Sequence, residues 1–505
     1  MITFTEKHPD QILGQLACFD RLIIQGTFPD ICHPQAITNF FFTYGIRIFD
    51  FKNWAAPLRD MINNNAKSIS EKYNIEIEFI RKKNFRKEER IKEILTKRGY
   101  HPGLVHIFSA MESCTAFKPW HDKSTHKTFL KYDSGRCLHY YFYFVDKNIG
   151  LCYLRIPTWV PFRLQFYFNG HNWLARQLDK SNIGYKQVEN AFVSIDNFES
   201  AQFIADSFSV KELHKVLNSY AAKLCPVMSL FKSGIHWSVM QAEYATDIIF
   251  KNRNSLAPIY EELVRTLSHA IKPDNLCMFL GKKLSPLFEG ELNEQFQTRI
   301  QGHSIRYYMA KNGIKMYDKF GMILRIETFS NDISFFKHLR KVEHRDGSCS
   351  NKIANMRKTI FSLPDLAKVM FACNRRYIEF LSCVEDPTSG IKKVNKISAT
   401  VRKNGRSFRG FNLFNSDDEI VFRTIAQGEA QCFGFRNANL RTALGKTTGQ
   451  ISGILRRLRT HGLIKKAPMS YKYYLTSFGR QVVSTSLKLK EMFIIPAMRG
   501  SIQFA

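Results

Sequence analysis

Residues 136–169 read RCLHYYFYFVDKNIGLCYLRIPTWVPFRLQFYFN and carry the densest strand pattern in the chain. Aromatic and branched side chains form several short runs, two of which are separated by a turn at Lys147–Gly150. The preceding run, LVHIFSAMES at residues 104–113, has the same character. Together these runs predict a largely antiparallel β region over residues 104–170.

Alternation along these strands divides their side chains between two faces of the sheet. Tyr141 and Tyr143 share one face of their strand, and Arg163 and Tyr167 share one face of a later strand. An exposed face with these side chains can stack unpaired bases and contact phosphate, so we expect these four residues to bind nucleic acid. The alternative is that another layer covers the tyrosines and that their hydroxyls find partners inside the protein.

The composition favours the same kind of partner. The 505 residues include 74 Lys+Arg against 44 Asp+Glu, which gives a formal net charge of +30. Phosphate backbones are the commonest partners of so large a positive charge. Because 44% of the residues are hydrophobic, the chain can bury sizeable cores and is not a disordered polycation.

Targeting and cysteine patterns narrow the class of protein further. The chain shows no signal-peptide pattern and no apolar run of membrane-spanning length, so we expect a cytoplasmic protein without a membrane partner. Its 11 cysteines include no C-x-x-C pair, which argues against a structural zinc site and a disulfide framework. The oligomeric state is left open.

A second β unit spans residues 304–329, SIRYYMAKNGIKMYDKFGMILRIETF. Asn312-Gly313 predicts a tight hairpin turn, because a type I′ turn needs positive φ at both central positions. A second turn falls at Phe320-Gly321. A three-residue second turn would place the polar residues of the last two strands on the same side of the sheet, and a two-residue turn would place them on opposite sides.

Part of this unit resembles a known family of enzymes. The segment IKMYDKFGMILRIETF is similar to the Y-D-K and L-R-x-E strand pair of rolling-circle replication initiators and related plasmid or phage nicking proteins, although it covers under a tenth of the chain. In such enzymes a tyrosine attacks a DNA phosphodiester while a metal polarises the phosphate. The histidine pair of their metal site is absent here. The residues that match are Lys315, Tyr317, Asp318, Lys319, Arg325 and Glu327.

The resemblance and the carboxylate spacing yield one catalytic hypothesis. The helical pattern near residues 237–250 places Glu243 and Asp247 four residues apart on one face, where two carboxylates can share Mg²⁺ with phosphate oxygens. If the protein nicks DNA, we expect Tyr317 to be the nucleophile and Glu327 to join Glu243 and Asp247 as metal ligands. Lys315, Lys319 and Arg325 would then contact the phosphate. The alternatives are a solvated helix face and a hairpin that grips phosphate without cutting it.

Residues 415–505 predict a winged helix-turn-helix. A capping box at Ser416–Glu419 begins one helix, a second helix covers Asn437–Leu444, and a third begins at Thr447 or Thr448. The stretch LIKKAPMSYKYYLT at residues 463–476 then predicts a β-hairpin.

This ending closely resembles the winged helix of bacterial transcription regulators, including the MarR-like group. The third helix can enter a major groove while the hairpin contacts phosphate, although the fold also serves as a protein-contact module. The expected nucleic-acid contacts are Ser452, Arg456, Arg457, Arg459, Lys465, Lys466 and Lys472.

The expected fold class is α+β: a multidomain chain with an antiparallel sheet body, helical insertions and a C-terminal winged helix-turn-helix. The expected regions are an α/β region with a basic helix (1–103), an antiparallel β region (104–170), a mainly helical region (171–303), a β-hairpin unit plus helices (304–388), a basic linker (389–414) and the winged helix-turn-helix domain (415–505).

Three functions fit these patterns. The first is a nucleic-acid-binding protein of a mobile genetic element, in which the winged helix finds a site and the basic body holds or nicks a DNA strand. The second is a non-catalytic protein that forms a ribonucleoprotein with a structured RNA. The third is a transcription regulator, although the residues that precede the winged helix are basic and aromatic, unlike a small-ligand sensor domain.

Overall fold

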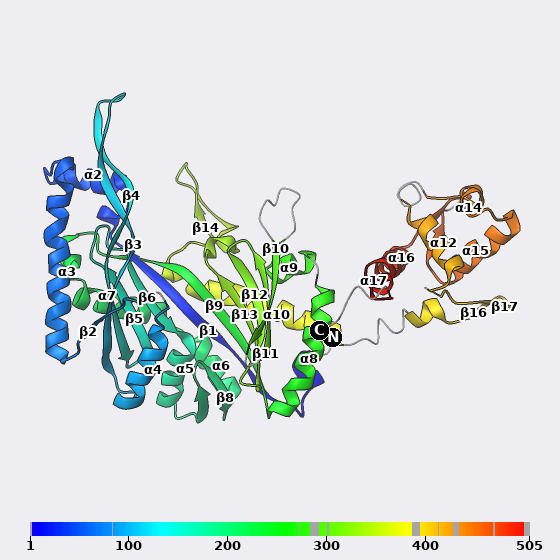
Figure 1. The fold of residues 1–505 in the computed structure, drawn as a ribbon, viewed down its shortest axis with the longest axis horizontal. Helices are drawn as coiled ribbons and strands as arrows, with labels where there is room; N and C mark the ends of the chain where they lie inside the picture. Colours follow the sequence, from blue (N-terminus) through cyan, green and yellow to red (C-terminus); the bar gives the residue numbers. More distant parts are fainter. Residues whose placement is uncertain are drawn as a thin grey trace. The chain divides into compact units, whose positions relative to one another are not determined.

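Figure 1 shows the protein as a computed structural model that divides into two compact units, Met1–Glu385 and Asp386–Ala505. We call them unit 1 and unit 2 and describe each by itself. The structure describes residues 3–82, 84–271, 273–282, 292–299, 302–385, 394–412, 414–427, 434–467 and 470–498.

An eleven-stranded sheet forms the body of unit 1, in the order β10-β11-β12-β13-β9-β1-β6-β5-β4-β3-β2. Strands β2 and β3 are parallel, and the other neighbours are antiparallel. The strands are β1 (Ile12–Thr27), β2 (Ile77–Phe79), β3 (Gly103–Asp122), β4 (Lys127–Asp146), β5 (Gly150–Pro157), β6 (Leu164–Asn169), β9 (His236–Phe250), β10 (Leu292–Arg299), β11 (Gly302–Met309), β12 (Asn312–Lys319) and β13 (Ile323–Ser330).

The antiparallel region predicted over residues 104–170 is confirmed by β3 to β6. The two predicted β regions also belong to one sheet, because β1 and β9 lie between them. The α+β class is therefore confirmed, with helices packed around one large mixed sheet.

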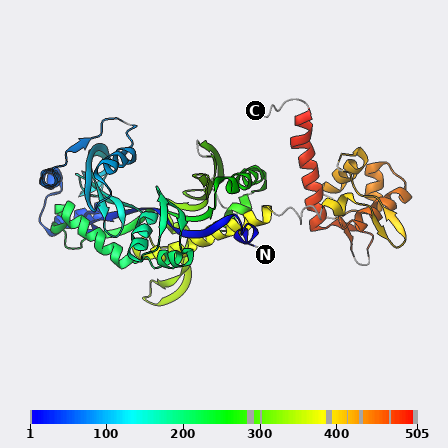
Figure 2. The ribbon, with the colours of Figure 1, turned by 90° about the horizontal axis from the view of Figure 1, so that it is seen from below.

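One face of this sheet supports the main hydrophobic core, which α3, α7, α8 and α10 complete. We call the opposite face the polar face. At one end it is covered by α5, α6 and the small hairpin β7–β8, and near β3 and β4 it is covered by α4. Figure 2 shows α4 and α10 on opposite sides of the sheet. The helices and the hairpin strands are α1 (Phe4–Lys7), α2 (Pro34–Thr43), α3 (Phe51–Tyr73), α4 (Lys87–Arg98), α5 (Gly170–Lys180), β7 (Tyr185–Val188), β8 (Ala191–Ile195), α6 (Phe198–Asp206), α7 (Val210–Leu224), α8 (Arg253–Ala270), α9 (Pro273–Phe279) and α10 (Leu363–Glu385).

The prediction of a helix near residues 237–250 is wrong, because these residues form the central strand β9. Its end, from Tyr244 to Phe250, is buried on both sides, and such a continuous apolar run does not distinguish a strand from a buried helix. Pairing with β1 on one edge and β13 on the other decides the conformation. Besides the helices α5 to α9, the 171–303 region therefore contains β7 to β10 and the start of β11.

The hairpin predicted around Asn312-Gly313 exists, but its turn lies two residues earlier, at Ala310-Lys311. Asn312 and Gly313 belong to β12, where the Asn312 side chain accepts a hydrogen bond from Ser330 at 2.6 Å. A Cβ atom on Gly313 would lie 2.1 Å from the Tyr307 carbonyl oxygen. Close packing, and not a turn conformation, therefore explains why residue 313 is a glycine.

Unit 2 consists mainly of helices around a separate core. Its elements are β16 (Val401–Lys403), β17 (Arg406–Phe408), α12 (Ser416–Ala426), α14 (Asn437–Leu444), α15 (Thr448–Thr460), β18 (Ile464–Lys466), β19 (Tyr473–Leu475), α16 (Ser477–Leu489) and α17 (Ile495–Met498). The predicted helices and the hairpin are present, and Thr447 caps α15 in a capping box with Gln450. The first helix is capped by Asn415, whose side chain accepts from two backbone N–H groups, and not by the predicted box at Ser416.

The described part of the predicted basic linker is folded. Ile397 and Phe411 are buried in the core of unit 2, and the Phe411 N–H donates to the Ile397 carbonyl at 2.8 Å. Composition suggested a linker because the segment is rich in glycine, serine and cations, but its few apolar residues suffice to anchor it.

Candidate functional site

The loop between β12 and β13 has three residues, Phe320 to Met322, and it settles the register of these strands. Phe320 and Gly321 both have positive φ, and the Gly321 N–H donates to Asp318 at 2.9 Å. Lys315 therefore lies opposite Glu327, and Tyr317 lies opposite Arg325. All four side chains emerge on the polar face.

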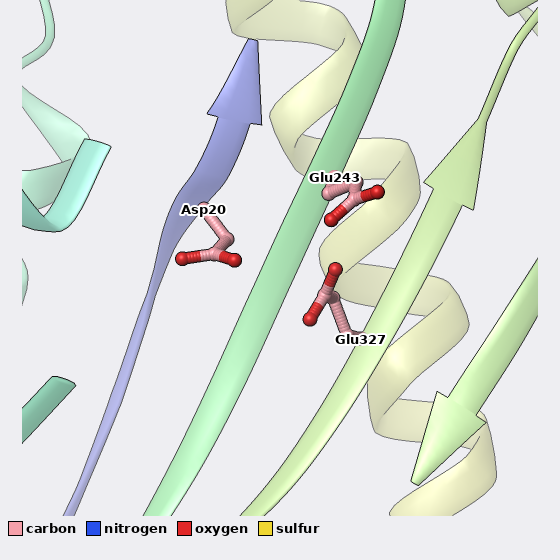
Figure 3. A group of neighbouring side chains, drawn as sticks. All are labelled: Asp20, Glu243 and Glu327. Atoms are coloured by element: carbon pink, nitrogen blue, oxygen red, sulfur yellow. The ribbon is translucent and has the colours of Figure 1, made fainter. Parts of the chain in front are cut away.

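Three carboxylates meet on this face, each from a different strand (Figure 3). Asp20 comes from β1, Glu243 from β9 and Glu327 from β13, and one oxygen of each lies within 4.8 Å of the others. A bulge between Phe19 and Arg21 shifts the alternation of β1 beside Asp20. We call these three residues the acid trio. Its oxygens are of the kind that divalent cations prefer.

Two further side chains from β12 contact the trio. The Lys315 Nζ lies 2.7 Å from Glu327 Oε1 and 3.2 Å from Glu243 Oε2. The Tyr317 hydroxyl donates to Glu327 Oε2 at 2.8 Å. Lys315, Tyr317 and Glu243 are partly exposed, whereas Glu327 is fully buried. A group that approaches the polar face would therefore reach Tyr317, Lys315 and Glu243 before it reached Glu327.

The protonation of the trio is uneven. Burial raises the pKa of Glu327 to about 8, with Glu243 and Asp20 adding to the rise and Lys315 opposing it. Burial also acts to raise the pKa of Glu243, but its hydrogen bond with Glu327 and the charge of Lys315 bring it below its usual value. The pKa of Tyr317 is raised well above its usual value by burial and by the charge of Glu327. Near neutral pH, Tyr317 is a phenol with a carboxyl group beside it.

A second cluster on the same face is closed to solvent. The Arg325 Nε and Nη2 atoms donate to the two oxygens of Asp247, both at 2.6 Å, and Arg325 is fully buried. His171, at the start of α5, lies 3.3 Å from Asp247 and 3.0 Å from Asp20. The predictions that Arg325 contacts phosphate and that Asp247 binds a metal are therefore wrong, because the two side chains form a buried bidentate ion pair with each other.

Lys319 also belongs to the closed cluster. Its ammonium group donates to the Asn190 side chain, and burial, together with the charge of Arg325, lowers its pKa to about 8. The expected phosphate contact at Lys319 is wrong, because the residue lies under the cover formed by α5 and β7–β8. Of the three predicted phosphate cations of this unit, Lys315 alone is partly exposed.

The expected stacking face is covered. Tyr141 and Tyr143 pack against Ile91 of α4, and the Tyr141 hydroxyl donates to Glu112 at 2.5 Å. Tyr167 is half-buried and stacks on Tyr153 with ring centroids 5.1 Å apart. The exposed platform is therefore absent at Tyr141 and Tyr143, where a covering layer is present, whereas Tyr167 lines a cavity with Tyr153.

A cavity of about 310 Å³ lies on the polar face beside the trio. Its polar lining includes Gln25, Arg155, Arg163, Gln165 and Gln241, and Gln241 precedes Glu243 by two residues on β9. Arg163, which directly precedes β6, therefore lines this cavity, whereas Tyr167 of β6 lines another cavity of about 570 Å³. The size of the first cavity lies at the lower end of the roughly 300–1,000 Å³ typical of small-ligand pockets.

In unit 2, the predicted contact residues have different environments. Arg456 and Arg459 are exposed on α15, and Lys465 and Lys466 are exposed on β18. Ser452 is half-buried and accepts a hydrogen bond from Asn437, and Lys472 is half-buried.

Arg457 has a structural role, so the prediction that it contacts nucleic acid is wrong. Its guanidinium donates to both oxygens of Asp418, at 2.6 and 2.9 Å, and lies 3.8 Å from the centre of the Phe411 ring. Asp418, on α12, is itself buried. The pair therefore ties α15 to α12.

Asp20 and His171 were missed by the sequence analysis. A signal for Asp20 exists, because it interrupts the apolar run LACFDRLII of residues 16–24, and a buried acid requires partners. His171 follows Asn169, which caps α5. Nothing local in the sequence connects this histidine to Asp20 and Asp247.

No family model, curated protein or solved structure matches this chain. None of the helices in the described ranges is both long enough and apolar enough to span a bilayer.

Proposed function

We propose that this protein binds nucleic acid and that unit 2 is a winged helix-turn-helix. The observation that carries this proposal is the group of exposed cations on α15 and β18 in a chain with a net charge of +30. The element order also supports it: α12, a bridge from Phe435 to Tyr473, α14, α15 and the hairpin β18–β19. A helix with exposed arginines beside a basic hairpin suits the major groove and its phosphates.

Salt dependence and two arginines test this binding. We expect the affinity of the full chain for labelled DNA to fall at least about 10-fold between 50 and 200 mM salt, because bound phosphates release counterions. The double variant Arg456→Gln/Arg459→Gln should weaken binding about 10-fold, whereas Arg480→Gln, an exposed arginine of α16, should have little effect. Fluorescence anisotropy measures all three. A flat salt response together with unchanged affinity of the double variant would reject the proposal.

A second candidate activity, cleavage of a DNA strand, is favoured by the contact between Tyr317 and Glu327 beside the other acids. Asp20, Glu243 and Glu327 would hold a divalent cation, which would polarise a phosphate. With the cation bound, Glu327 would have lost its own proton, so the Tyr317 oxygen would form a bond to phosphorus while its proton passes to the Glu327 carboxylate. The bond from phosphorus to the leaving deoxyribose oxygen would break, and that oxygen would leave as a hydroxyl. Lys315 lies where it can contact the phosphate or compete with the cation.

Covalent capture tests this activity. With Mg²⁺ or Mn²⁺ and end-labelled single-stranded DNA, we expect a protein–DNA adduct on a denaturing gel. Tyr317→Phe should lower its yield at least about 100-fold, because the nucleophile is lost. The control is Tyr308→Phe, which removes a hydroxyl from a partly exposed tyrosine on the adjacent strand β11. An adduct that forms equally in Tyr317→Phe would contradict the assignment.

The other two functions make different predictions. A ribonucleoprotein component would bind one structured RNA more tightly than DNA, but two of the three tyrosines expected to stack bases, Tyr141 and Tyr143, are buried beneath α4. A transcription regulator would bind a duplex motif and yield no adduct. The same affinity assay with RNA, duplex and single-stranded probes therefore separates the three. The winged helix and the nicking site together favour the first function, that of a DNA-handling protein of a mobile genetic element.

A further inference from the structure

A two-stranded ribbon formed by β14 (Lys337–Glu343) and β15 (Cys349–Asn355) projects from unit 1 (Figure 1). Its base is anchored on both strands. Phe336 and Met356 are buried in the main core, and the Met356 N–H donates to the Phe336 carbonyl at 2.9 Å. The His338 Nδ1 lies 3.3 Å from Asp365 of α10. The fold thus holds the base of the ribbon firmly while its outer part is exposed.

One face of the ribbon carries four exposed cross-strand pairs; the outermost, Glu343 opposite Cys349, lies toward the tip, and the other three lie nearer the base. Leu339 lies opposite Ile353, and these side chains are 68% and 71% exposed. On either side of this aliphatic pair lies a lysine opposite an asparagine: Lys337 with Asn355 and Lys341 with Asn351. None of the six side chains forms a hydrogen bond or ion pair with another described residue. We call these six residues the ribbon face.

The chemistry of the ribbon face matches the edges of base pairs. Lysine donates to the O6 and N7 atoms of guanine, asparagine pairs with the N6 and N7 atoms of adenine, and aliphatic groups contact the thymine methyl. The whole ribbon, residues 337–355, contains five Lys and Arg residues against two acids. Arg345, near the tip, adds a cation that can reach a phosphate. The charge and the apolar pair together favour a polyanion with methyl groups in its groove.

We propose that the ribbon face reads the major groove of duplex DNA. That groove is about 12 Å wide and admits a two-stranded ribbon. Neighbouring rows of the ribbon face lie roughly 6.8 Å apart, which equals about two base-pair steps, so three rows span about five base pairs. The deep, narrow major groove of an RNA duplex would exclude the same ribbon. The inference rests on the proposed nucleic-acid binding and specifies a second reading element besides α15.

Selection from random duplexes tests the inference with the full chain. We expect the wild-type protein to enrich a motif with two parts, one read by α15 and one of about five base pairs read by the ribbon. The variant Leu339→Thr/Ile353→Thr keeps strand-forming residues and should lose the second part only. An unchanged motif would overturn the inference and leave the proposed function intact. A wild-type protein that binds no duplex would overturn both.

Matched single variants separate base contact from general charge. Lys341→Gln and Lys352→Gln remove the same charge, but Lys341 belongs to the ribbon face and Lys352 points to the opposite side. We expect Lys341→Gln to reduce the preference for the selected duplex over a scrambled one roughly 10-fold. Lys352→Gln should weaken binding to both duplexes equally. Equal behaviour of the two variants would overturn the inference.

Cys349 gives a direct measure of proximity. It is the exposed cysteine among the nine whose side chains the structure describes, and it lies on the same side of the ribbon as the ribbon face. A duplex that carries a disulfide-linked thiol on a major-groove cytosine amine should exchange it for a bond to Cys349, and Cys349→Ser should not crosslink. Crosslinking only from a minor-groove tether, or equally in Cys349→Ser, would overturn the inference.

Discussion

The polar face has a closed half, around Arg325, and an open half, around Glu327, and the environments of the two halves differ. Arg325 and Glu327 are neighbours on one face of β13, and both are fully buried, but Arg325 is closed in by Asp247, His171 and Asn190. Glu327 instead contacts Lys315 and Tyr317, which are partly exposed. The cover formed by α5 and β7–β8 accounts for the difference. Residues with the same apparent role in a motif can therefore be structural or reactive according to what lies over them.

Breaking the closed half should have the largest effect on folding. Arg325→Met leaves Asp247 buried without its bidentate partner, so we expect a loss of about 3–5 kcal/mol in the free energy of unfolding. Arg306→Met, on the same face of β11 but half-buried, should cost about 1 kcal/mol or less. Urea denaturation monitored by circular dichroism measures both. Equal losses would show that the closed cluster is not the special element of this face.

In the open half, the raised pKa of Glu327 should make the free energy of unfolding depend on pH. The pKa of Glu327 is about 8 in the folded protein, above its usual value, so its stabilising contribution is complete below the unfolded pKa and is lost as the pH rises through about 8. Glu327→Gln mimics the protonated form and should flatten this dependence. One pKa unit corresponds to about 1.4 kcal/mol, so the two proteins should diverge by at least about 2 kcal/mol between pH 5 and 8. Parallel curves would contradict the raised pKa.

Cation binding should produce the smallest of these effects. If the acid trio binds Mg²⁺ or Mn²⁺, a concentration tenfold above the dissociation constant stabilises the folded state by about 1.4 kcal/mol. We expect Glu243→Gln to lose this shift in thermal unfolding, because Glu243 supplies one of the three carboxylates. Glu71→Gln, an exposed acid of α3, is the control. A shift that survives in Glu243→Gln would place the cation elsewhere.

Local patterns in the sequence predicted the strands of both β regions and grouped Lys315 and Tyr317 on one face. The predicted helix also placed Glu243 and Asp247 on a common face, although for the wrong reason, since residues four apart share a face in a strand as well as in a helix. The register between β12 and β13 depended on whether their loop has two or three residues, and the sequence did not decide between these lengths.

The remaining features depend on contacts that the sequence does not encode locally. The helix α4 covers the tyrosines from outside the meander, and His171 reaches the acids from a segment distant from them in the chain. Asp20 joins the trio beside a bulge in β1, and bulges have no firm sequence signature. The closed and open halves could therefore be distinguished only in the folded protein.

The most direct test of nucleic-acid binding is to purify the full chain without nuclease treatment and to sequence whatever co-purifies, as both DNA and RNA. The proposed function predicts DNA fragments that share a motif and that dissociate as salt is raised. A protein that carries no nucleic acid and binds none of the DNA or RNA probes at 50 mM salt would contradict it.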